Sequence, residues 1–344
     1  MSMNKSIIPI FIPHVGCPHD CSFCNQKRIA GERREVSGKE LSETIDTYLS
    51  TITNDKASIE VAFYGGSFTG LPLDNQRELL MPAYRAKEAG KIDDIRLSTR
   101  PDYINDKVLS EIYKLGVSTI ELGVQSTNDE VLIKNLRGHS SQDVEMAVNL
   151  IKAYNIQLGL QMMIGLLGDT PETIAETVKD FIKWRPNFVR IYPTIVIKDT
   201  HLEELYNLGI YKPMDLEEVI SIGKDALLAF NTANIPVIRM GLQSTEEITY
   251  GVGIVAGPYH PAYRELVETE IFRDKIQREF DKEDIKNSQE IVIYCNKRDP
   301  SKVAGYKKSN KDYFTHKYKL KSLKIKITDQ LMEGELVVKN DSDN

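Results

Sequence analysis

Short apolar runs alternate with longer amphipathic stretches over residues 7–241 of the chain. The short runs predict strands at 7–12, 59–64, 94–98, 117–124, 157–164, 188–192 and 236–241. The stretches between them place apolar residues at helical spacing, which predicts helices at 41–51, 75–89, 106–115, 141–154, from 171 onward and at 215–231. Strands that alternate with helices in this way are typical of βα units around a parallel sheet.

The number of these units predicts an α/β fold, a partial (β/α)6 barrel of the TIM-like kind. Strands that are buried on both faces read as nearly continuous apolar runs. Two of the predicted strands depart from this pattern, because Glu60 and Glu121 interrupt their apolar residues. We therefore expect these two carboxylates to point into a barrel interior that contains solvent.

The chain changes character after the predicted barrel. A helix is predicted to begin within 257–268 and to continue through 273–280, and strands at 290–295 and 323–327 flank a helix near 310–319. We expect three parts: a barrel domain at 1–243, a helical connection packed on the barrel at 244–289, and a small basic α/β module at 290–344. Cys295 lies in an apolar strand of that module, and we expect it to be buried and inert.

The last module is rich in basic and aromatic residues. Residues 296–326 contain eleven lysines and arginines against two acids, and the interleaved aromatic residues are Tyr306, Tyr313, Phe314 and Tyr318. This combination is found in proteins that bind nucleic acids. Lysines on the solvated face of a small domain produce the same composition without a partner, so both interpretations stay open.

Composition limits the class of protein. The net charge of −6 does not by itself indicate a nucleic-acid partner, and a hydrophobic content of 41% is ordinary for a globular chain. No apolar run is long enough to span a membrane, and the first residues do not read as a signal peptide. With only four cysteines, three of them clustered, disulfides are not expected. We expect a cytoplasmic protein without a membrane partner.

Three of the four cysteines, Cys17, Cys21 and Cys24, follow the first predicted strand with the spacing C-x3-C-x2-C. Three thiolates on an iron–sulfur cube leave one iron open to another ligand. Structural zinc needs four ligands, and His14, His19 or Asp20 could supply the fourth. A redox dithiol formed by Cys21 and Cys24 is a third interpretation.

Polar and glycine motifs follow the other predicted strands as well. In (β/α) barrels the reactive residues lie on loops at the carboxyl ends of the strands. All of these motifs are therefore expected on one rim of the barrel, which a zinc knuckle would not predict. After the cysteine loop, the motifs are 65–68 (Gly-Gly-Ser-Phe), 98–102 (Ser-Thr-Arg-Pro-Asp), 125–126 (Gln-Ser), 165–168 (Gly-Leu-Leu-Gly) and 192–194 (Tyr-Pro-Thr).

The cysteine spacing, with Phe23 before the third cysteine, resembles that of radical S-adenosylmethionine (SAM) enzymes. The resemblance implies a 4Fe–4S cluster held by Cys17, Cys21 and Cys24, with SAM on the open iron as the source of a 5′-deoxyadenosyl radical. It also implies SAM contacts from Phe23, Gly65, Gly66, Ser67, Ser98, Arg100, Gln125 and Arg137. The alternatives are structural: Phe23 as a core anchor, a turn at Gly65–Gly66, an ion pair between Arg100 and Asp102, and a solvated loop at Arg137.

Over residues 5–270 the motifs resemble the Elongator catalytic-subunit branch of these enzymes. Its "ETRPD" segment is similar to 98–102, although Ser98 stands where that branch has Glu, and its "RGH" segment is similar to 137–139. Its "KIYPT" strand is similar to 190–194. By this resemblance Tyr192 and Arg239 are candidate substrate contacts, with core packing as the alternative, and His139 supports the SAM site indirectly. Glu121 is either a rim residue or a paired structural charge.

Residues 271–344 contain no glycine-rich acyl-CoA loop, and we expect the acetyltransferase domain of that branch to be absent. The remaining architecture resembles a queuine lyase. Such an enzyme is a carbon–nitrogen lyase that converts queuine to 7-aminomethyl-7-deazaguanine for queuosine salvage. The predicted partners are a queuine-like base and a flavodoxin or ferredoxin as electron donor. The alternatives are a radical SAM enzyme that modifies a tRNA base in place and, from another class, a non-catalytic zinc protein that interacts with RNA.

Overall fold

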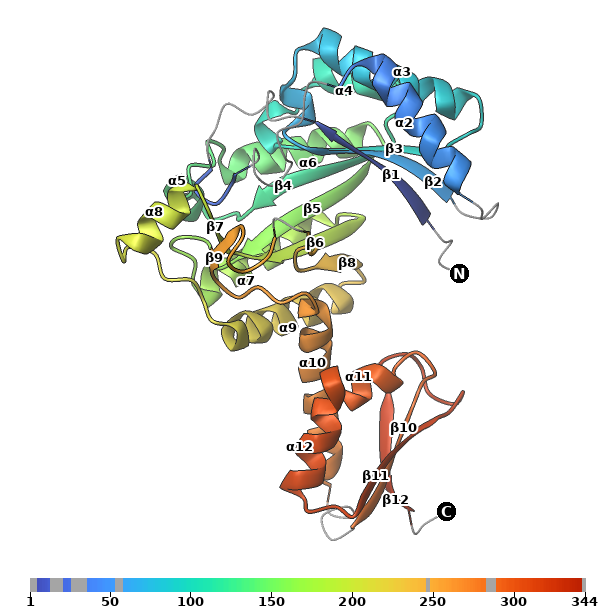
Figure 1. Cartoon of the computed structure of the whole chain (residues 1–344), viewed down its shortest axis with the longest axis vertical. Helices are drawn as coiled ribbons and strands as arrows, with labels where there is room; N and C mark the ends of the chain where they lie inside the picture. Colours follow the sequence, from blue (N-terminus) through green and yellow to red (C-terminus); the bar gives the residue numbers. More distant parts are fainter. Residues whose placement is uncertain are drawn as a thin grey trace. The chain divides into compact units, whose positions relative to one another are not determined.

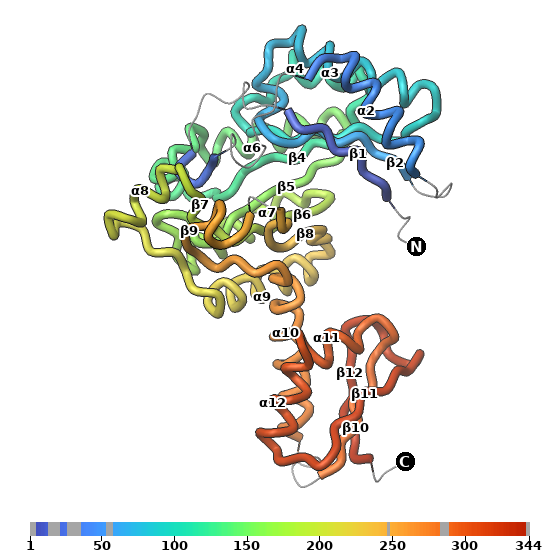
Figure 2. Tube along the Cα trace, in the orientation of Figure 1, coloured from blue at the N-terminus to red at the C-terminus, as the bar shows by residue number. Residues whose placement is uncertain are grey.

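The structure is a computed structural model that describes residues 5–12, 21–25, 36–52, 58–245, 248–282 and 289–341. Contacts within the chain divide it into two compact units. The first comprises Met1–Asp215 and Ala229–Tyr259, and the second comprises Leu216–Leu228 and His260–Asn344. Figures 1 and 2 show the course of the chain in the same orientation. Each unit is described by itself below.

The first unit contains a seven-stranded sheet that curls into a half-barrel (Figure 1). All neighbouring strands pair in parallel, in the order β1-β2-β3-β4-β5-β6-β8. The predicted α/β partial barrel is thereby confirmed, with the strand at 236–241 as the seventh member. The strands are β1 (Lys5–Ile12), β2 (Ser58–Gly65), β3 (Asp94–Thr99), β4 (Thr119–Gln125), β5 (Gln157–Ile164), β6 (Phe188–Pro193) and β8 (Val237–Met240).

The predicted helices are present between the strands. Their starts follow ordinary capping rules. Ser140 caps α6 and Thr170 caps α7, and each cap side chain accepts from the N–H of the third helical residue, whose side chain accepts from the cap N–H in return. Pro171 occupies the first position of α7, where its missing N–H removes no helical bond. The helices are α2 (Gly38–Thr51), α3 (Leu73–Glu88), α4 (Asp106–Lys114), α6 (Ser141–Ala153), α7 (Pro171–Trp184) and α9 (Leu216–Thr232).

Two short α-helices and two short strands of the first unit were not predicted. They are α5 (Asp129–Lys134), β7 (Val196–Ile197), α8 (His201–Asn207) and β9 (Ile254–Ala256). Each is too short to show an apolar period in the sequence. They lie in loops that follow strands or, for β9, before α10, and α5 and α8 contribute to the surroundings of the cysteine turn described below.

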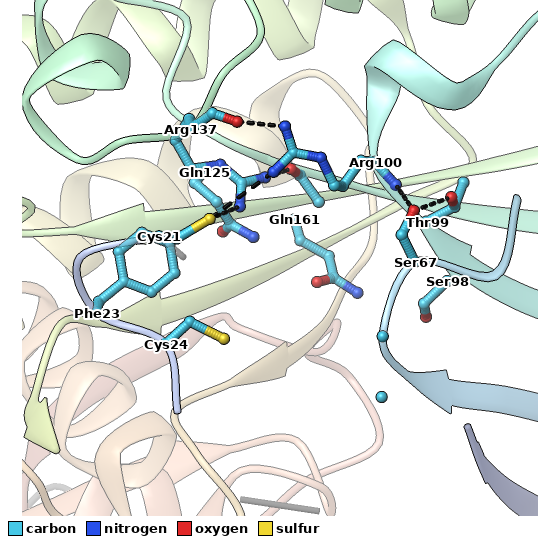
Figure 3. Close-up of a pocket in the computed structure, with 13 residues that line it drawn as sticks. Cys21, Phe23, Cys24, Ser67, Ser98, Thr99, Arg100, Gln125, Arg137 and Gln161 are labelled. Atoms are coloured by element: carbon cyan, nitrogen blue, oxygen red, sulfur yellow. Dashed lines mark hydrogen bonds between the residues drawn. The ribbon is translucent and has the colours of Figure 1, made fainter. Parts of the chain in front are cut away.

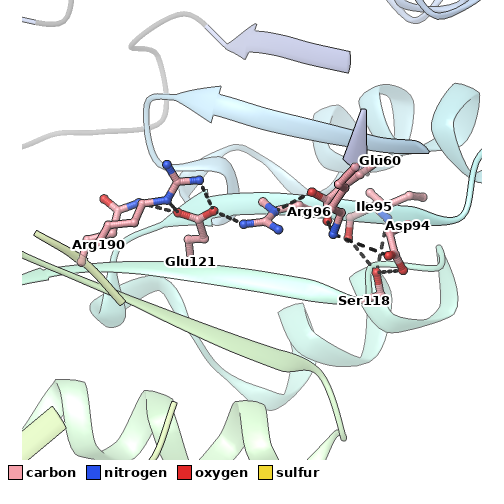
Figure 4. A network of polar contacts seen from close by, with 9 residues as sticks. Glu60, Asp94, Ile95, Arg96, Ser118, Glu121 and Arg190 are labelled. Carbon is pink, nitrogen blue, oxygen red and sulfur yellow. Dashed lines mark hydrogen bonds and ion pairs between the residues drawn. The ribbon is translucent and has the colours of Figure 1, made fainter. Parts of the chain in front are cut away.

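The concave face of the sheet carries a chain of buried ion pairs (Figure 4). Arg96 on β3 donates from Nε to Glu60 Oε2 on β2 at 2.9 Å and from Nη1 to Glu121 Oε1 on β4. Arg190 on β6 lies 2.7 Å from Glu121 Oε2 through its Nε. Both carboxylates are 0% exposed. Burial opposes the charged form of Glu121, but attraction by Arg190 and Arg96 outweighs it and holds the pKa of Glu121 below its usual range.

These ion pairs answer the question left by the strand pattern. Glu60 and Glu121 point into the barrel, as the sequence predicts, but cationic side chains rather than solvent surround them. For Glu121 the alternative of a paired structural charge is therefore the correct one. The chain of ion pairs links β2, β3, β4 and β6 across the face of the sheet.

The second unit packs three helices against a three-stranded sheet of order β11-β10-β12. Phe272, Ile276 and Phe280 of α10 join Ile291, Ile293 and Cys295 of β10 in one apolar cluster. Cys295 is 0% exposed, and burial raises its pKa to about 11. The elements are α10 (Tyr263–Phe280), β10 (Glu290–Cys295), α11 (Pro300–Ala304), α12 (Ser309–Lys317), β11 (Ser322–Ile327) and β12 (Leu336–Asn340).

The helix, strands and basic module expected after the barrel are therefore present, and β12 is an addition that was not predicted. The division at 1–243, 244–289 and 290–344 stays a prediction about boundaries. The structure adds that α10 shares a core with the C-terminal sheet. Among the described residues, no helix is both long and apolar enough to cross a membrane.

We predict that Glu121→Gln lowers the free energy of unfolding by about 3 kcal/mol or more, because it leaves Arg190 buried without a carboxylate. Urea denaturation followed by circular dichroism measures this change. Glu145→Gln is the control, since Glu145 pairs with Lys183 on the exposed surface and little change is expected there. Equal effects of the two substitutions would show that the buried ion pairs do not stabilise the barrel.

Candidate functional site

A pocket opens at the carboxyl ends of the first strands of the half-barrel (Figure 3). The loops after β2, β3 and β4 meet the cysteine turn there, as expected for parallel strands, whose carboxyl ends share one edge. The pocket is lined by Cys21, Phe23, Cys24, Gly65, Gly66, Ser67, Ser98, Thr99, Arg100, Gly123, Gln125, Arg137 and Gln161. The structure thus brings together all eight residues predicted to contact SAM and two of the three predicted cluster cysteines.

The cysteine turn presents two sulfur atoms to the pocket. Cys24 N donates to Cys21 O at 2.9 Å, which closes a tight turn between the two cysteines. Cys21 is 5% exposed, and its Sγ lies 3.1 Å from Arg137 Nη1 and 3.7 Å from Arg100 Nη1. The thiolate is the form of cysteine that binds metals, and the two guanidinium groups place positive charge beside it. Cys17 lies outside the described residues.

The loop after β2 depends on a glycine and a hydroxyl group. Gly65 has φ +108°, and a Cβ at this position would lie 2.5 Å from the carbonyl oxygen of Ile12, so only glycine lets β1 approach this closely. Ser67 Oγ hydrogen-bonds Thr99 Oγ1 at 2.7 Å and accepts from Arg100 N at 3.2 Å. Ser67 therefore joins the loops after β2 and β3.

The end of β4 is irregular where it meets the pocket. The pairing of β4 with β5 shifts between Gly123 and Gln125, and Gln125 adopts a left-handed φ of 74°. Such backbone conformations in residues other than glycine are uncommon and cluster at functional sites. The irregularity turns the Gln125 side chain into the pocket.

Three buried polar atoms of the pocket lack hydrogen-bond partners among the residues that the structure describes. Ser98 Oγ, Gln125 Oε1 and Arg137 Nε are buried and have no hydrogen-bond partner within the described part of the chain. Buried polar atoms are normally paired, so such a group of orphans marks a place for a polar ligand. Two thiols, two guanidinium groups and these orphaned atoms fit an iron–sulfur cluster with a zwitterionic nucleoside-bearing ligand.

Arg100 is heavily engaged by the protein. Its Nε donates to Asp102 Oδ1 at 2.9 Å and its Nη2 to Asp102 Oδ2 at 3.1 Å, which is the ion pair that the sequence left as an alternative. The Nη2 atom also donates to the carbonyl oxygen of Arg137. Arg137 in turn donates from Nη2 to the carbonyl oxygen of Gly123. These bonds tie the two arginines to each other and to β4.

His139 is buried behind the pocket and does not line it. It is 7% exposed, and both ring nitrogens lack a side-chain partner among the described residues. Burial, followed by the nearby charges of Arg137 and Arg100, lowers its pKa to about 3. The imidazole is therefore neutral at ordinary pH.

Phe23 lies where it can serve both as a SAM contact and as an anchor of the cysteine loop in the core. Its ring lines the pocket and lies 5.8 Å from the guanidinium carbon of Arg137. The same ring packs against an apolar cluster of Val196, Leu202 and Tyr211. It can therefore anchor the turn and face a ligand at once.

The two candidate substrate residues are not among those that line the pocket. Tyr192 lies on β6 two residues after Arg190 and is half-buried; desolvation by its surroundings raises its pKa, while the Arg190 charge opposes the rise. Arg239 on β8 is opposite Arg190 in the strand register, and its Nε donates to the carbonyl oxygen of Gly241 at 3.2 Å. Both residues belong to the barrel strands beyond the pocket.

Sequence reasoning missed three residues of the pocket, namely Thr99, Gly123 and Gln161. Thr99 belongs to the motif at 98–102, where it stands between two more conspicuous neighbours. Gln161 is a polar residue in the otherwise apolar strand β5, a signal of the same kind as Glu60 and Glu121. It donates from Nε2 to Glu121 Oε2 at 2.8 Å, which connects the ion-pair chain to the pocket.

Comparisons with curated proteins find relatives named tRNA uridine(34) acetyltransferase and Elongator complex protein 3. The tRNA uridine(34) acetyltransferase of Methanocaldococcus infernus is 27% identical over 256 residues, covering 63% of this chain and 48% of the relative. Elongator complex protein 3 of Homo sapiens is 33% identical over 144 residues, covering 40% of this chain and 26% of the relative. The chain spans about half the length of the archaeal acetyltransferases that it matches.

Comparisons with solved structures concern the fold. The archaeal Methanocaldococcus infernus Elp3 with an N-terminal deletion superposes with a TM-score of 0.61 at 24% identity, covering 80% of this chain and 64% of that one. Streptococcus suis SuiB bound to S-adenosylmethionine superposes with a TM-score of 0.50 at 13% identity, covering 71% of this chain and 51% of that one.

The family matches cover most of the chain. Residues 11–181 match the description "Radical SAM superfamily", and residues 186–273 match the radical SAM C-terminal domain. The first match includes the cysteine loop and every strand end that lines the pocket. With this match, the half-barrel and the Elp3-like relatives, the chain belongs to the radical SAM superfamily.

Proposed function

We propose that Cys17, Cys21 and Cys24 hold a 4Fe–4S cluster and that the eight predicted pocket residues bind SAM beside it. The superfamily uses both cofactors. When bound, the cluster supplies an electron that cleaves SAM to a 5′-deoxyadenosyl radical. The observation that carries this assignment is the convergence of Cys21 and Cys24 with the orphaned atoms of Ser98 and Gln125 in one pocket.

Within this site the protein's own residues have distinct tasks. Gly65 exposes backbone where a side chain would collide with β1, so a ligand can approach the loop closely. Ser98 and Gln125 offer hydrogen bonds to polar groups of SAM. Arg137 retains donors for a carboxylate, whereas Arg100 is mostly occupied by Asp102 and orients the site.

The proposed reaction is the cleavage of a carbon–nitrogen bond in queuine, giving 7-aminomethyl-7-deazaguanine. Abstraction of a hydrogen atom from the cyclopentenediol by the 5′-deoxyadenosyl radical would start it, giving 5′-deoxyadenosine. The C–N bond would then break, the amine would take the proton of the neighbouring hydroxyl group and stay with the deazaguanine, and the ring would leave as a carbonyl radical that takes one electron from the electron donor and one proton from solvent. The support is the resemblance to queuine lyases together with the concave face beyond the pocket. Tyr192 there can stack on a planar base, and Arg239 can donate to its acceptor atoms. A flavodoxin or ferredoxin is the proposed electron donor.

A second candidate is modification of a tRNA base in place. Two observations favour it: several relatives are named tRNA uridine(34) acetyltransferases, and the second unit exposes lysines outside ion pairs. Lys307, Lys308 and Lys311 are exposed and have no carboxylate partner within the described residues. Lysines of this kind suit the phosphates of an RNA.

We predict that Cys21→Ala and Cys24→Ala abolish cluster binding, because two remaining thiolates cannot hold the cube. Iron content and visible absorbance after anaerobic reconstitution measure the loss. Cys295→Ala is the matched control and should reconstitute fully, since that thiol is buried in the other unit. Normal iron content in Cys21→Ala would refute the proposed ligand set.

We predict that protein reconstituted with cluster, SAM and dithionite converts queuine to 7-aminomethyl-7-deazaguanine and forms 5′-deoxyadenosine in step with it. Liquid chromatography with mass spectrometry measures both products. Tyr192→Phe and Arg239→Gln should raise KM for queuine about tenfold, the effect of removing one hydrogen bond to a substrate, without loss of cluster. Unchanged queuine beside steady uncoupled 5′-deoxyadenosine would remove this substrate but keep the radical chemistry.

For the RNA candidate we predict that Lys307→Ala, Lys308→Ala and Lys311→Ala together weaken tRNA binding. The slope of log affinity against log salt should become shallower by about three units, because each lysine that pairs with a phosphate adds roughly one unit to the slope. Filter binding at several salt concentrations measures the slope. A triple alanine variant at the exposed Lys39, Lys114 and Lys183 removes the same charge as a control. Equal weakening by both variants would argue against a site at 307–311.

A further inference from the structure

The cysteine turn is held in place through Ser22, which lies between Cys21 and Cys24 and is 0% exposed. Its N–H donates to the carbonyl oxygen of Asn135 at 3.1 Å, and its Oγ donates to Asn135 Oδ1 at 2.8 Å. Its carbonyl oxygen accepts from Leu202 N at 2.7 Å. Every polar group of Ser22 is thus bonded to a residue more than a hundred positions away along the chain.

Asn135 follows α5 and is itself 0% exposed. Its Oδ1 accepts from Ser22 Oγ and from Leu167 N at 3.3 Å. Its Nδ2 donates to Leu167 O at 3.0 Å and to Val131 O at 2.8 Å. The amide therefore uses both acceptor sites and both donors, the full capacity of an asparagine. It joins the cysteine turn, the end of α5 and the loop after β5.

A second set of hydrogen bonds joins the cysteine turn to the segment that connects β6 and α9. Asn25 Nδ2 donates to the carbonyl oxygens of Lys198 and Asp199 at 3.0 and 3.2 Å. Leu202 of α8 bonds Ser22 through its N–H and packs in the cluster that receives Phe23. The turn is thus fixed by the backbone and side chains around it on two sides.

The chemistry of position 135 is specific. Aspartate has the same shape but no amide donors, so it would face the carbonyl oxygens of Val131 and Leu167 without a hydrogen. Alanine would leave Ser22 Oγ and both backbone groups of Leu167 without their partners in a buried place. The requirement for both donors and acceptors explains why an asparagine stands here.

We propose that Asn135 is a positioning residue for the iron–sulfur cluster. By fixing Ser22 it fixes the direction of the chain on both sides, and so the spacing and orientation of the Cys21 and Cys24 sulfur atoms. A turn that is already in place binds the cluster more tightly and releases iron more slowly than one that must be ordered. This inference rests on the proposed cluster ligands and is independent of the substrate.

The test compares Asn135→Ala and Ser22→Ala with the wild-type protein after anaerobic reconstitution. The first measurement is the rate of iron loss to a ferrous chelator. We expect it to rise about tenfold in Asn135→Ala, the size of effect seen when residues that orient metal ligands are removed, and by a smaller factor in Ser22→Ala. The second measurement is the electron paramagnetic resonance spectrum of the reduced cluster with and without SAM, which should change in both variants.

The matched control is Asn310→Ala. Asn310 is also a 0% exposed asparagine with side-chain bonds, to Arg273 and Thr269, but it lies in the second unit. It should lower the thermal unfolding temperature and leave iron release and the spectrum as in the wild-type protein. A merely structural role for Asn135 would make the two asparagine variants behave alike.

Wild-type iron release and spectrum in folded Asn135→Ala would overturn the inference. If that variant does not fold, Ser22→Ala decides alone, because it removes one hydroxyl group and nothing else. Cys21→Ala separates this inference from the proposed ligand set. If Cys21→Ala keeps its cluster, the proposed ligand set is wrong. If Cys21→Ala loses the cluster while Ser22→Ala and Asn135→Ala both match the wild-type protein, only the proposed role of Asn135 is wrong.

Discussion

The pairing of Glu121 with Arg96 and Arg190 is the interaction on which the barrel and its site both depend. A lone carboxylate at 0% exposure would be too costly to keep charged, so the two guanidinium groups must stay where they are. Their positions tie β3, β4 and β6 together on the concave face. The second oxygen of Glu121 also accepts from Gln161, a residue of the pocket. The charges that hold the sheet together therefore also orient the floor of the site.

The sequence predicts the architecture well because buried parallel strands have nearly continuous apolar sequences. The runs at 157–164 and 290–295 match β5 and β10 residue for residue. Since parallel strands end at one edge, the motifs after them could be placed on one rim before any contact was known. The eight residues predicted to bind SAM line a common pocket for this reason. Short elements such as α5 and β12 were not predicted, because they contain too few residues to show a periodic pattern of apolar positions.

The sequence could not predict which partners most individual side chains contact. The residues Arg100 and Asp102 are neighbours in one motif, and only the structure tells that their ion pair coexists with a contact from Arg100 to Cys21. Asn135 has no motif at all, and its importance arises from three segments that meet around one amide. Tyr192 and Arg239 lie on strands beyond the pocket lining, which their motifs do not indicate. Contacts of this kind depend on tertiary packing and leave no local trace in sequence.

The distribution of charge on the concave face also bears on the substrate. Glu60 and Glu121 are paired with Lys5, Arg96 and Arg190, so both carboxylates of this face have counter-charges. Arg239 on β8 differs, because it has no carboxylate partner in the described parts of the chain. Its Nε donates to the carbonyl oxygen of Gly241 instead. A cation without a counter-charge inside a barrel favours a ligand that brings acceptor atoms. For the proposed queuine reaction, a deazaguanine carbonyl next to Tyr192 would meet this requirement, whereas an apolar substrate would offer Arg239 no acceptor.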